Sequence, residues 1–251
     1  MLVGKDIELV EGLPVMHIRS LRALVVSDLH LGYEGGMAKS GLAIPKANLK
    51  SVTGILAKAA KGRGVTRVIV VGDVKNDFSG VIGEEVNELR EIVQAMKGIS
   101  VAIEVVKGNH DNFLDSYSRA LGIKVHGSQL LEGGYLFAHG DKQLPKSSGV
   151  VGTVIIGHEH PSIGIRSRAG TLERLRCFLH GTFSYAGRDT ELIVLPAIGY
   201  FETGSDVNLR GRGGVMSPVL KKADIDQMEA IAIGDGLTLN FGRLKDLKDV
   251  T

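Results

Sequence analysis

Short runs of apolar residues alternate with helical repeats along the first half of the chain. The runs at 24–26, 68–71 and 101–106 are rich in β-branched residues, which is typical of strands buried on both faces. Between them, apolar positions three or four residues apart predict helices over about 45–62 and 84–97. The order strand, helix, strand, helix, strand indicates an α/β layered fold with parallel strands.

The second half of the chain loses the helical repeat and reads as short strands joined by turns. We expect strands at 135–138, 151–156, 163–168, 172–179 and 192–195, and a closing hairpin of 230–233 with 237–241. Another hairpin, of 7–10 with 15–18, is predicted at the start of the chain. Two glycine-rich stretches without periodicity, 32–43 and 200–215, are expected to be loops.

The overall composition is that of one globular domain. The chain has 251 residues, 43% hydrophobic and 23% charged, and no obvious linker, so we expect residues 1–251 to form a single domain. A formal net charge of only +2 excludes the strong global field of a protein that binds nucleic acid by charge alone.

The single cysteine, Cys177, excludes an intrachain disulfide and fits a reducing compartment. Because it lies beside Phe178 and Leu179, we interpret it as a small core residue rather than a nucleophile. The first residues are charged, and no apolar run approaches the ~18 residues of a membrane helix. We therefore expect a cytoplasmic protein without membrane contact.

Metal-binding side chains follow the apolar strands at five places. In chain order the motifs are Asp28-x-His30, Gly72-Asp73, Gly108-Asn109-His110-Asp111, His139-Gly140 and Gly157-His158-x-His160. Each motif alone is weak evidence, because a single histidine after a strand is more often part of a structural hydrogen bond. Together the five motifs hold five of the eight histidines of the chain. Each motif follows a strand, and in α/β sheets ligand sites lie at the carboxyl ends of the strands. The set therefore predicts one metal site at a sheet edge.

These motifs, in this order, resemble those of the calcineurin-like metallophosphoesterase superfamily. The resemblance spans residues 23–160, and the stretch 27–32 is most similar to small ICC-like phosphoesterases, including the archaeal and DNA-ligase-associated group. It implies an α-β-β-α sandwich of two mixed β-sheets flanked by helices. Residues 161–251 would then add strands and the closing hairpin to this core.

The resemblance also implies a set of ligands for two divalent metal ions. Asp28, His30 and His160 would hold one ion, Asn109, His139 and His158 the other, and Asp73 would bridge them. Such mixed nitrogen and oxygen donors suit Mn²⁺, which we expect first, and also Fe, Zn or Ni. Two ions about 3.5–4 Å apart can share a hydroxide, and its in-line attack would cleave a phosphoester without a covalent intermediate.

Two residues of the third motif are expected to act in catalysis. His110 would stabilise the transition state and protonate the leaving oxygen, and Asp111 would orient its imidazole. An equally good interpretation of Asp111 is that it caps a helix beginning at Asn112. The run Val74–Asp77 differs from the Asp-Arg-Gly sequence of the protein Ser/Thr phosphatases, which argues against a phosphoprotein substrate.

The expected function is a metal-dependent phosphodiesterase acting on a nucleotide or on a nucleic-acid-derived phosphodiester. The alternatives are a phosphomonoesterase and a non-catalytic protein-binding scaffold with the same fold, although a scaffold needs eroded motifs and these are intact. A homodimer through the closing hairpin stays open. A DNA-repair partner would rest on the resemblance alone.

Arginines and aromatic residues were the remaining candidates for substrate contact. The arginines lie at 166, 168, 174, 176, 210 and 212 and could grip phosphate, but we favour a solvated strand face balanced by Glu173 and Asp189. Aromatic residues make up only 5% of the chain, so a base-stacking platform is not evident. The only ring contacts the sequence offers are at positions 33, 113, 185 and 200.

Overall fold

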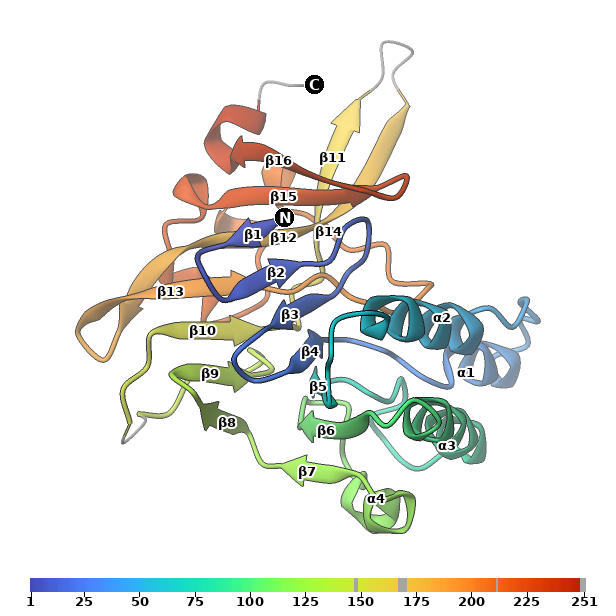
Figure 1. Ribbon diagram of the computed structural model, residues 1–251. Coiled ribbons are helices and arrows are strands. Elements are labelled where there is room, and N and C mark those ends of the chain that lie inside the picture. Colours follow the sequence, from blue (N-terminus) through green and yellow to red (C-terminus); the bar gives the residue numbers. More distant parts are fainter. Residues whose placement is uncertain (147–148, 167–170, 211, 249–251) are drawn as a thin grey trace.

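Two β-sheets pack against each other, and helices cover the outer face of the first (Figure 1). The computed structural model describes residues 1–146, 149–166, 171–210 and 212–248. Inward-facing residues of both sheets, such as Val25, Ile69, Phe137 and Phe178, form one buried cluster between them. The expected layered sandwich of two mixed sheets is confirmed.

The first sheet holds seven strands in chain order. They are β1 (Leu2–Val3), β2 (Ile7–Leu9), β3 (Met16–Ile18), β4 (Ala23–Val26), β5 (Arg67–Val71), β6 (Ala102–Val106) and β7 (Lys124–His126). The first four strands pair antiparallel, and β4 to β7 pair parallel. Parallel neighbours need crossover connections, which the helices between them supply.

Helices α2 (Asn48–Ala60) and α3 (Gly83–Lys97) cover this sheet and bury their apolar faces against it. Val52 and Leu56 of α2 and Leu89 of α3 are at most 2% exposed, as their helical spacing predicts. Two shorter helices, α1 (Tyr33–Lys39) and α4 (Asp115–Leu121), lie on the same side (Figure 1).

The second sheet is built from the later half of the chain. Its strands are β8 (Gln129–Glu132), β9 (Tyr135–Ala138), β10 (Thr153–Ile156), β11 (Pro161–Arg166), β12 (Leu172–Tyr185), β13 (Arg188–Val194), β14 (Ser205–Asp206), β15 (Glu229–Gly234) and β16 (Leu237–Arg243). The closing hairpin is confirmed as β15 and β16, and among the described residues β16 pairs only with β15. Cys177 lies on β12 and is fully buried in the core, as expected.

A thin outer layer covers the other face of the second sheet. It consists of α5 (Val207–Arg210) and the 3₁₀ turns η1 (Arg212–Gly214), η2 (Leu220–Lys222), η3 (Ile225–Gln227) and η4 (Leu244–Leu247). Val207, Leu220 and Leu244 of this layer pack into a core with Leu179 and Val194 of the sheet. No helix in the described ranges is long and apolar enough to span a membrane.

Both glycine-rich stretches contain structure that their sequence did not indicate. Residues 33–39 form α1 rather than a loop, and 205–210 form β14 and α5. In α1, the Glu34 carboxylate accepts hydrogen bonds from the backbone amides of Ala47 and Asn48, at the start of α2. Tertiary contacts of this kind outweigh the weak local helix preference of glycine.

Candidate metal centre

Five loops carry the predicted ligands to one place. Strands β4, β5 and β6 of the first sheet and β9 and β10 of the second all end there, because each set runs parallel. Backbone hydrogen bonds join the loops to one another: Asp28 N donates to Gly72 O, and His30 N donates to Asp73 O. The sheet-edge location predicted from the strand-end pattern is confirmed by the topology.

Five of these ligand candidates have a left-handed backbone. Their φ angles are 58° at Asp28, 46° at His30, 49° at Asp73, 67° at His158 and 46° at His160. Residues other than glycine rarely adopt this conformation, and such strain gathers at functional sites. Here it turns the chain sharply at the end of each strand, so that side chains from different loops face a common point.

Glycines in the motifs leave room for these side chains. A Cβ at Gly72 would lie 2.2 Å from His139 Nδ1, and a Cβ at Gly108 would lie 2.2 Å from Asp73 Oδ1. Both distances are far below a possible contact, so each glycine allows a ligand from a neighbouring loop to approach the backbone closely.

The first group of ligand atoms belongs to Asp28, His30 and His160, which lie within 4.8 Å of one another. His160 Nε2 is 3.1 Å from Asp28 Oδ1 and 3.4 Å from His30 Nε2. Asp28 is fully buried, and its carboxylate also accepts a hydrogen bond from the backbone amide of His158.

The second group, Asp73, His139 and His158, meets the same 4.8 Å limit. His139 Nε2 is 3.0 Å from Asp73 Oδ2, and the rings of His139 and His158 are 5.0 Å apart, centroid to centroid. The two groups adjoin, because His139 Nδ1 also lies 3.9 Å from Asp28 Oδ1 of the first group.

These two groups fit divalent transition metals. His139 Nδ1 lies 3.1 Å from the Val71 carbonyl oxygen. When the neutral ring carries its proton on Nδ1 and donates it to this oxygen, the Nε2 atom keeps a free lone pair. That Nε2 atom is buried and makes no hydrogen bond of good geometry. Carboxylate and imidazole donors with a free lone pair on buried nitrogen are what such a cation requires.

Buried charges in the centre shift the pKa values of its candidate ligands. The neighbouring histidines, above all His160, hold the pKa of Asp28 well below its usual range despite burial. Burial opposes protonation of His160, but Asp28 and Glu202 outweigh it and raise its pKa to about 10. Asp73 and Asp28 likewise overcome burial and raise the pKa of His139 to about 9. Metal binding would therefore displace protons from these imidazoles.

Glu202 is part of the centre and was missed from the sequence. Its Oε2 lies 3.1 Å from His160 Nδ1 and so directs the Nε2 atom of that ring toward the first group. Glu202 lies in the glycine-rich stretch 200–215, for which the sequence predicts only a loop. The hydrogen bond from Gly199 N to Asp28 O brings this segment to the centre. No local pattern marks such a carboxylate.

His110 lies beside the second group, with its Nε2 3.9 Å from Asp73 Oδ2. Its Nδ1 is 2.6 Å from the Asn76 carbonyl oxygen, which orients the imidazole. Asp111 does not contact this ring, so the orienting contact expected of it is not made, and its assignment as a catalytic residue stays a prediction. Asn109 is exposed at the rim of the centre, and its assignment as a ligand stays a prediction.

Asp111 instead joins two loops through their backbones. Its Oδ1 accepts a hydrogen bond from Val74 N at 2.9 Å, and its Oδ2 accepts one from Gly108 N at 2.9 Å. The alternative role as a helix cap is wrong, because α4 begins only at Asp115 without a side-chain cap. The fully buried carboxylate fixes the spacing between the loops of Asp73 and His110.

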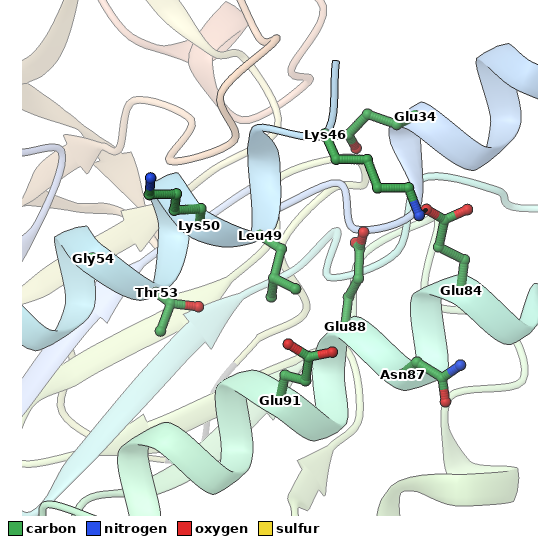
Figure 2. A pocket seen from close by; sticks show the side chains of 10 residues that line it. All are labelled: Glu34, Lys46, Leu49, Lys50, Thr53, Gly54, Glu84, Asn87, Glu88 and Glu91. Carbon is green, nitrogen blue, oxygen red and sulfur yellow. Dashed lines mark ion pairs between the residues drawn. The ribbon is translucent and has the colours of Figure 1, made fainter. Parts of the chain in front are cut away.

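A cavity of about 740 Å³ between α2 and α3, lined by several acidic side chains that include Glu88, lies beside the loop of His30 (Figure 2). Glu88, on α3, accepts a hydrogen bond from Gly32 N at 2.7 Å. Asn48, the first residue of α2, donates to the carbonyl oxygens of both Leu29 and His30 at 3.0 Å. These buried contacts hold the first motif in place without touching its ligand atoms.

Two of the candidate arginines, Arg174 and Arg176, bind neighbouring groups of the protein. Arg174 Nε donates to the Asp206 carboxylate at 2.9 Å, and Arg176 donates to the carbonyl oxygens of Ala197, Gly199 and Tyr200. Arg174 is therefore balanced by Asp206 and not by the expected Glu173 or Asp189, and the interpretation of this face as solvated and without a role in substrate contact stays a prediction. Arg168 and the side chains of residues 210 and 212 lie outside the described parts.

A family model described as calcineurin-like phosphoesterase matches residues 21–182, which is more than half of the chain. The chain therefore belongs to the calcineurin-like phosphoesterase family, a family of metal-dependent hydrolases. A search of curated proteins gives no significant match.

The solved structures that are similar to it include the following two. Nuclease MPE of Pseudomonas putida has 18% sequence identity and a TM-score of 0.61, over 92% of this chain and 93% of that one. YfcE, a phosphoesterase from E. coli, has 15% identity and a TM-score of 0.41, over 88% of this chain and 98% of that one. The first of these likenesses shows a shared fold.

Proposed function

We propose that the protein is a dinuclear metal-dependent phosphodiesterase acting on a nucleotide or a nucleic-acid-derived phosphodiester. The observation that carries the proposal is the meeting of strand ends from both sheets, which holds two adjoining carboxylate–imidazole groups with a further imidazole beside them. The nuclease activity named for the similar P. putida structure supports testing nucleic-acid substrates first.

The ligand assignment follows the two groups of the structure. We assign Asp28, His30 and His160 to one ion, His139, His158 and Asn109 to the other, and Asp73 to both. Mn²⁺ is our first choice, and Fe, Zn or Ni suit the same donors. When bound, such ions polarise phosphoryl oxygens and lower the pKa of an attacking water.

His110 supplies the proton that the departing group needs. Because its Nδ1 proton is directed to the Asn76 carbonyl, the ring presents Nε2 to the centre. A protonated Nε2 can donate to the leaving oxygen, a contribution typically worth about 10²–10⁴-fold in rate. This help matters most for a sugar alkoxide, which is a poor leaving group, and so favours a diester.

The test compares hydrolysis of bis-p-nitrophenyl phosphate with that of p-nitrophenyl phosphate, with Mn²⁺ and then with EDTA. Faster and EDTA-sensitive cleavage of the diester is expected. Faster cleavage of the monoester would contradict the proposal and favour a phosphomonoesterase. If no metal supports turnover of either compound, a non-catalytic binding scaffold would be favoured instead. His110→Ala should lower the rate on an alkyl diester at least about 100-fold.

The proposal extends to the location of the protein and its partners. We place the protein in the cytoplasm from its single buried cysteine. A homodimer is proposed through β16, an edge strand on which Leu237 and Leu239 are each 52% exposed. Light scattering of the wild type and of Leu239→Lys tests the dimer, and a DNA-repair partner rests on the family resemblance.

A further inference from the structure

An exposed aromatic ring stands next to the residue proposed to protonate the leaving group. Phe78 lies in the connection between β5 and α3, and 64% of it is exposed. Its ring centroid is 5.7 Å from that of His110, with the two planes at 81° in an edge-to-face arrangement. The Phe78 side chain is therefore exposed to solvent and at the same time lies next to the proposed reaction site.

The loop that carries Phe78 is held from below by a buried lysine. Lys75 is 1% exposed, and its Nζ donates to the carbonyl oxygens of Asp77, Gly80 and His110. The only acid paired with it among the described residues is Glu85, 3.8 Å away, whose Oε1 also accepts the Asp77 amide hydrogen.

The backbone of Phe78 itself is also fixed. Its carbonyl oxygen accepts a hydrogen bond from Asn112 Nδ2 at 3.2 Å, and Asn112 follows the His110 motif. The ring is therefore presented by an anchored backbone that is hydrogen-bonded to the loop of His110. Such preorganisation is expected of a surface that receives a ligand.

The ring is not needed to orient His110, because the Asn76 carbonyl already does so at 2.6 Å. What lies next to His110 during the reaction is the leaving group, since that imidazole donates to the leaving oxygen. Phe78 offers this group an apolar π-face and no charge, which suits neither a phosphate nor a sugar hydroxyl. It suits a flat heteroaromatic ring, and every nucleobase has one.

We propose that Phe78 stacks on the nucleobase of the leaving nucleoside and thereby selects diesters whose departing side carries a base. This inference rests on the proposed phosphodiesterase function and names the part of the substrate that it recognises. The sequence did not nominate Phe78, because nothing local distinguishes it from a scattered surface phenylalanine.

The experiment uses dithymidine phosphate and two analogues that lack the base on the 3′ or the 5′ side, with wild type, Phe78→Ala, Phe78→Leu and Phe78→Tyr. For wild type, removing the base on the departing side should lower kcat/KM roughly 5- to 150-fold, as expected for one stacked base. Phe78→Ala should lower kcat/KM on the full substrate by a similar factor and make the enzyme indifferent to that base. Phe78→Tyr should retain the discrimination, whereas Phe78→Leu, apolar without a π-face, should lose most of it.

Val81→Ala, in the same loop, is the control for loop integrity and should leave the discrimination unchanged. An equal loss for Phe78→Ala on all three substrates would show that the ring only supports His110 and would overturn the inference. Wild type that cleaves all three substrates equally would overturn it too. If wild type cleaves none of them nor bis-p-nitrophenyl phosphate, the proposed function has failed rather than the stacking.

Discussion

Left-handed backbone at five ligand positions costs about 1–3 kcal/mol each, and only the surrounding contacts keep it in place. Those contacts come from residues far away in the chain, such as the Gly72 carbonyl that accepts from Asp28 N and the Asp73 carbonyl that accepts from His30 N. At the scale of single residues, the centre is therefore defined as much by its supporting groups as by its ligands.

Replacing Glu202 by Gln should weaken metal binding at the first group about 10- to 100-fold, because His160 loses the charged partner that fixes its tautomer. Calorimetric titration of the metal-free protein with Mn²⁺ measures the change. The exposed Glu173→Gln carries the same change of charge and should bind like wild type. Equal affinities for wild type and Glu202→Gln would refute the supporting role.

Gly108→Ala should lower activity at least about 100-fold, because its Cβ would displace the Asp73 carboxylate. Gly127→Ala is the matched control, since its Cβ would meet no atom within 4 Å. Initial rates with bis-p-nitrophenyl phosphate compare the two, and circular dichroism confirms that both are folded. A fully active Gly108→Ala variant would contradict this expectation and show that the loop of Asp73 can shift to make room for the added Cβ.

At the scale of elements, the sequence predicted the residues at the strand ends, but not the hydrogen bonds that hold the loops after them. Asp28 and His139 directly follow apolar runs, so the pattern alone placed both at a sheet edge. Asp111 was assigned to the wrong partner because its hydrogen bonds go to amides brought close only by the packed loops. Helix α1 escaped prediction for a similar reason, as its stability comes from Glu34 bonded to the start of α2.

The parallel strands β5 to β7 are joined by charges whose effect depends on pH. Burial would raise the pKa of Glu104, but His126 and Arg67 outweigh it and hold the pKa below its ordinary value of 4.5. A lowered pKa in the folded state stabilises the fold above pH 4.5, and this contribution is lost as pH falls through the folded value.

Glu104→Gln should therefore destabilise the protein at pH 7, and the difference from wild type should shrink as pH falls below about 4.5. Urea unfolding between pH 7 and pH 3 measures it. Glu91→Gln, on the exposed side of α3, should show no such trend. A difference that stays constant down to pH 3 would contradict the ion-pair explanation.

At the scale of the whole molecule, the metal centre joins the two sheets. Asp28 and Asp73 come from the first sheet, and His139 and His160 follow strands of the second. A bound ion is thus a cross-link between layers that otherwise meet through apolar packing.

Saturating Mn²⁺ should raise the melting temperature of the metal-free protein, and EDTA should reverse the rise. At 100 times the dissociation constant one site adds about 2.7 kcal/mol, or roughly 5–10 °C for a chain of this size. Differential scanning calorimetry measures the shift. Asp73→Asn should reduce it strongly, and an undiminished shift would place the binding elsewhere.

Because the candidate ligands are spread from Asp28 to His160, they leave the ribosome at different times during synthesis. During synthesis the first-sheet carboxylates emerge well before the histidines of the second sheet. An ion that needs both cannot be held firmly by the nascent first half. Metal uptake therefore reports that the second sheet has closed onto the first.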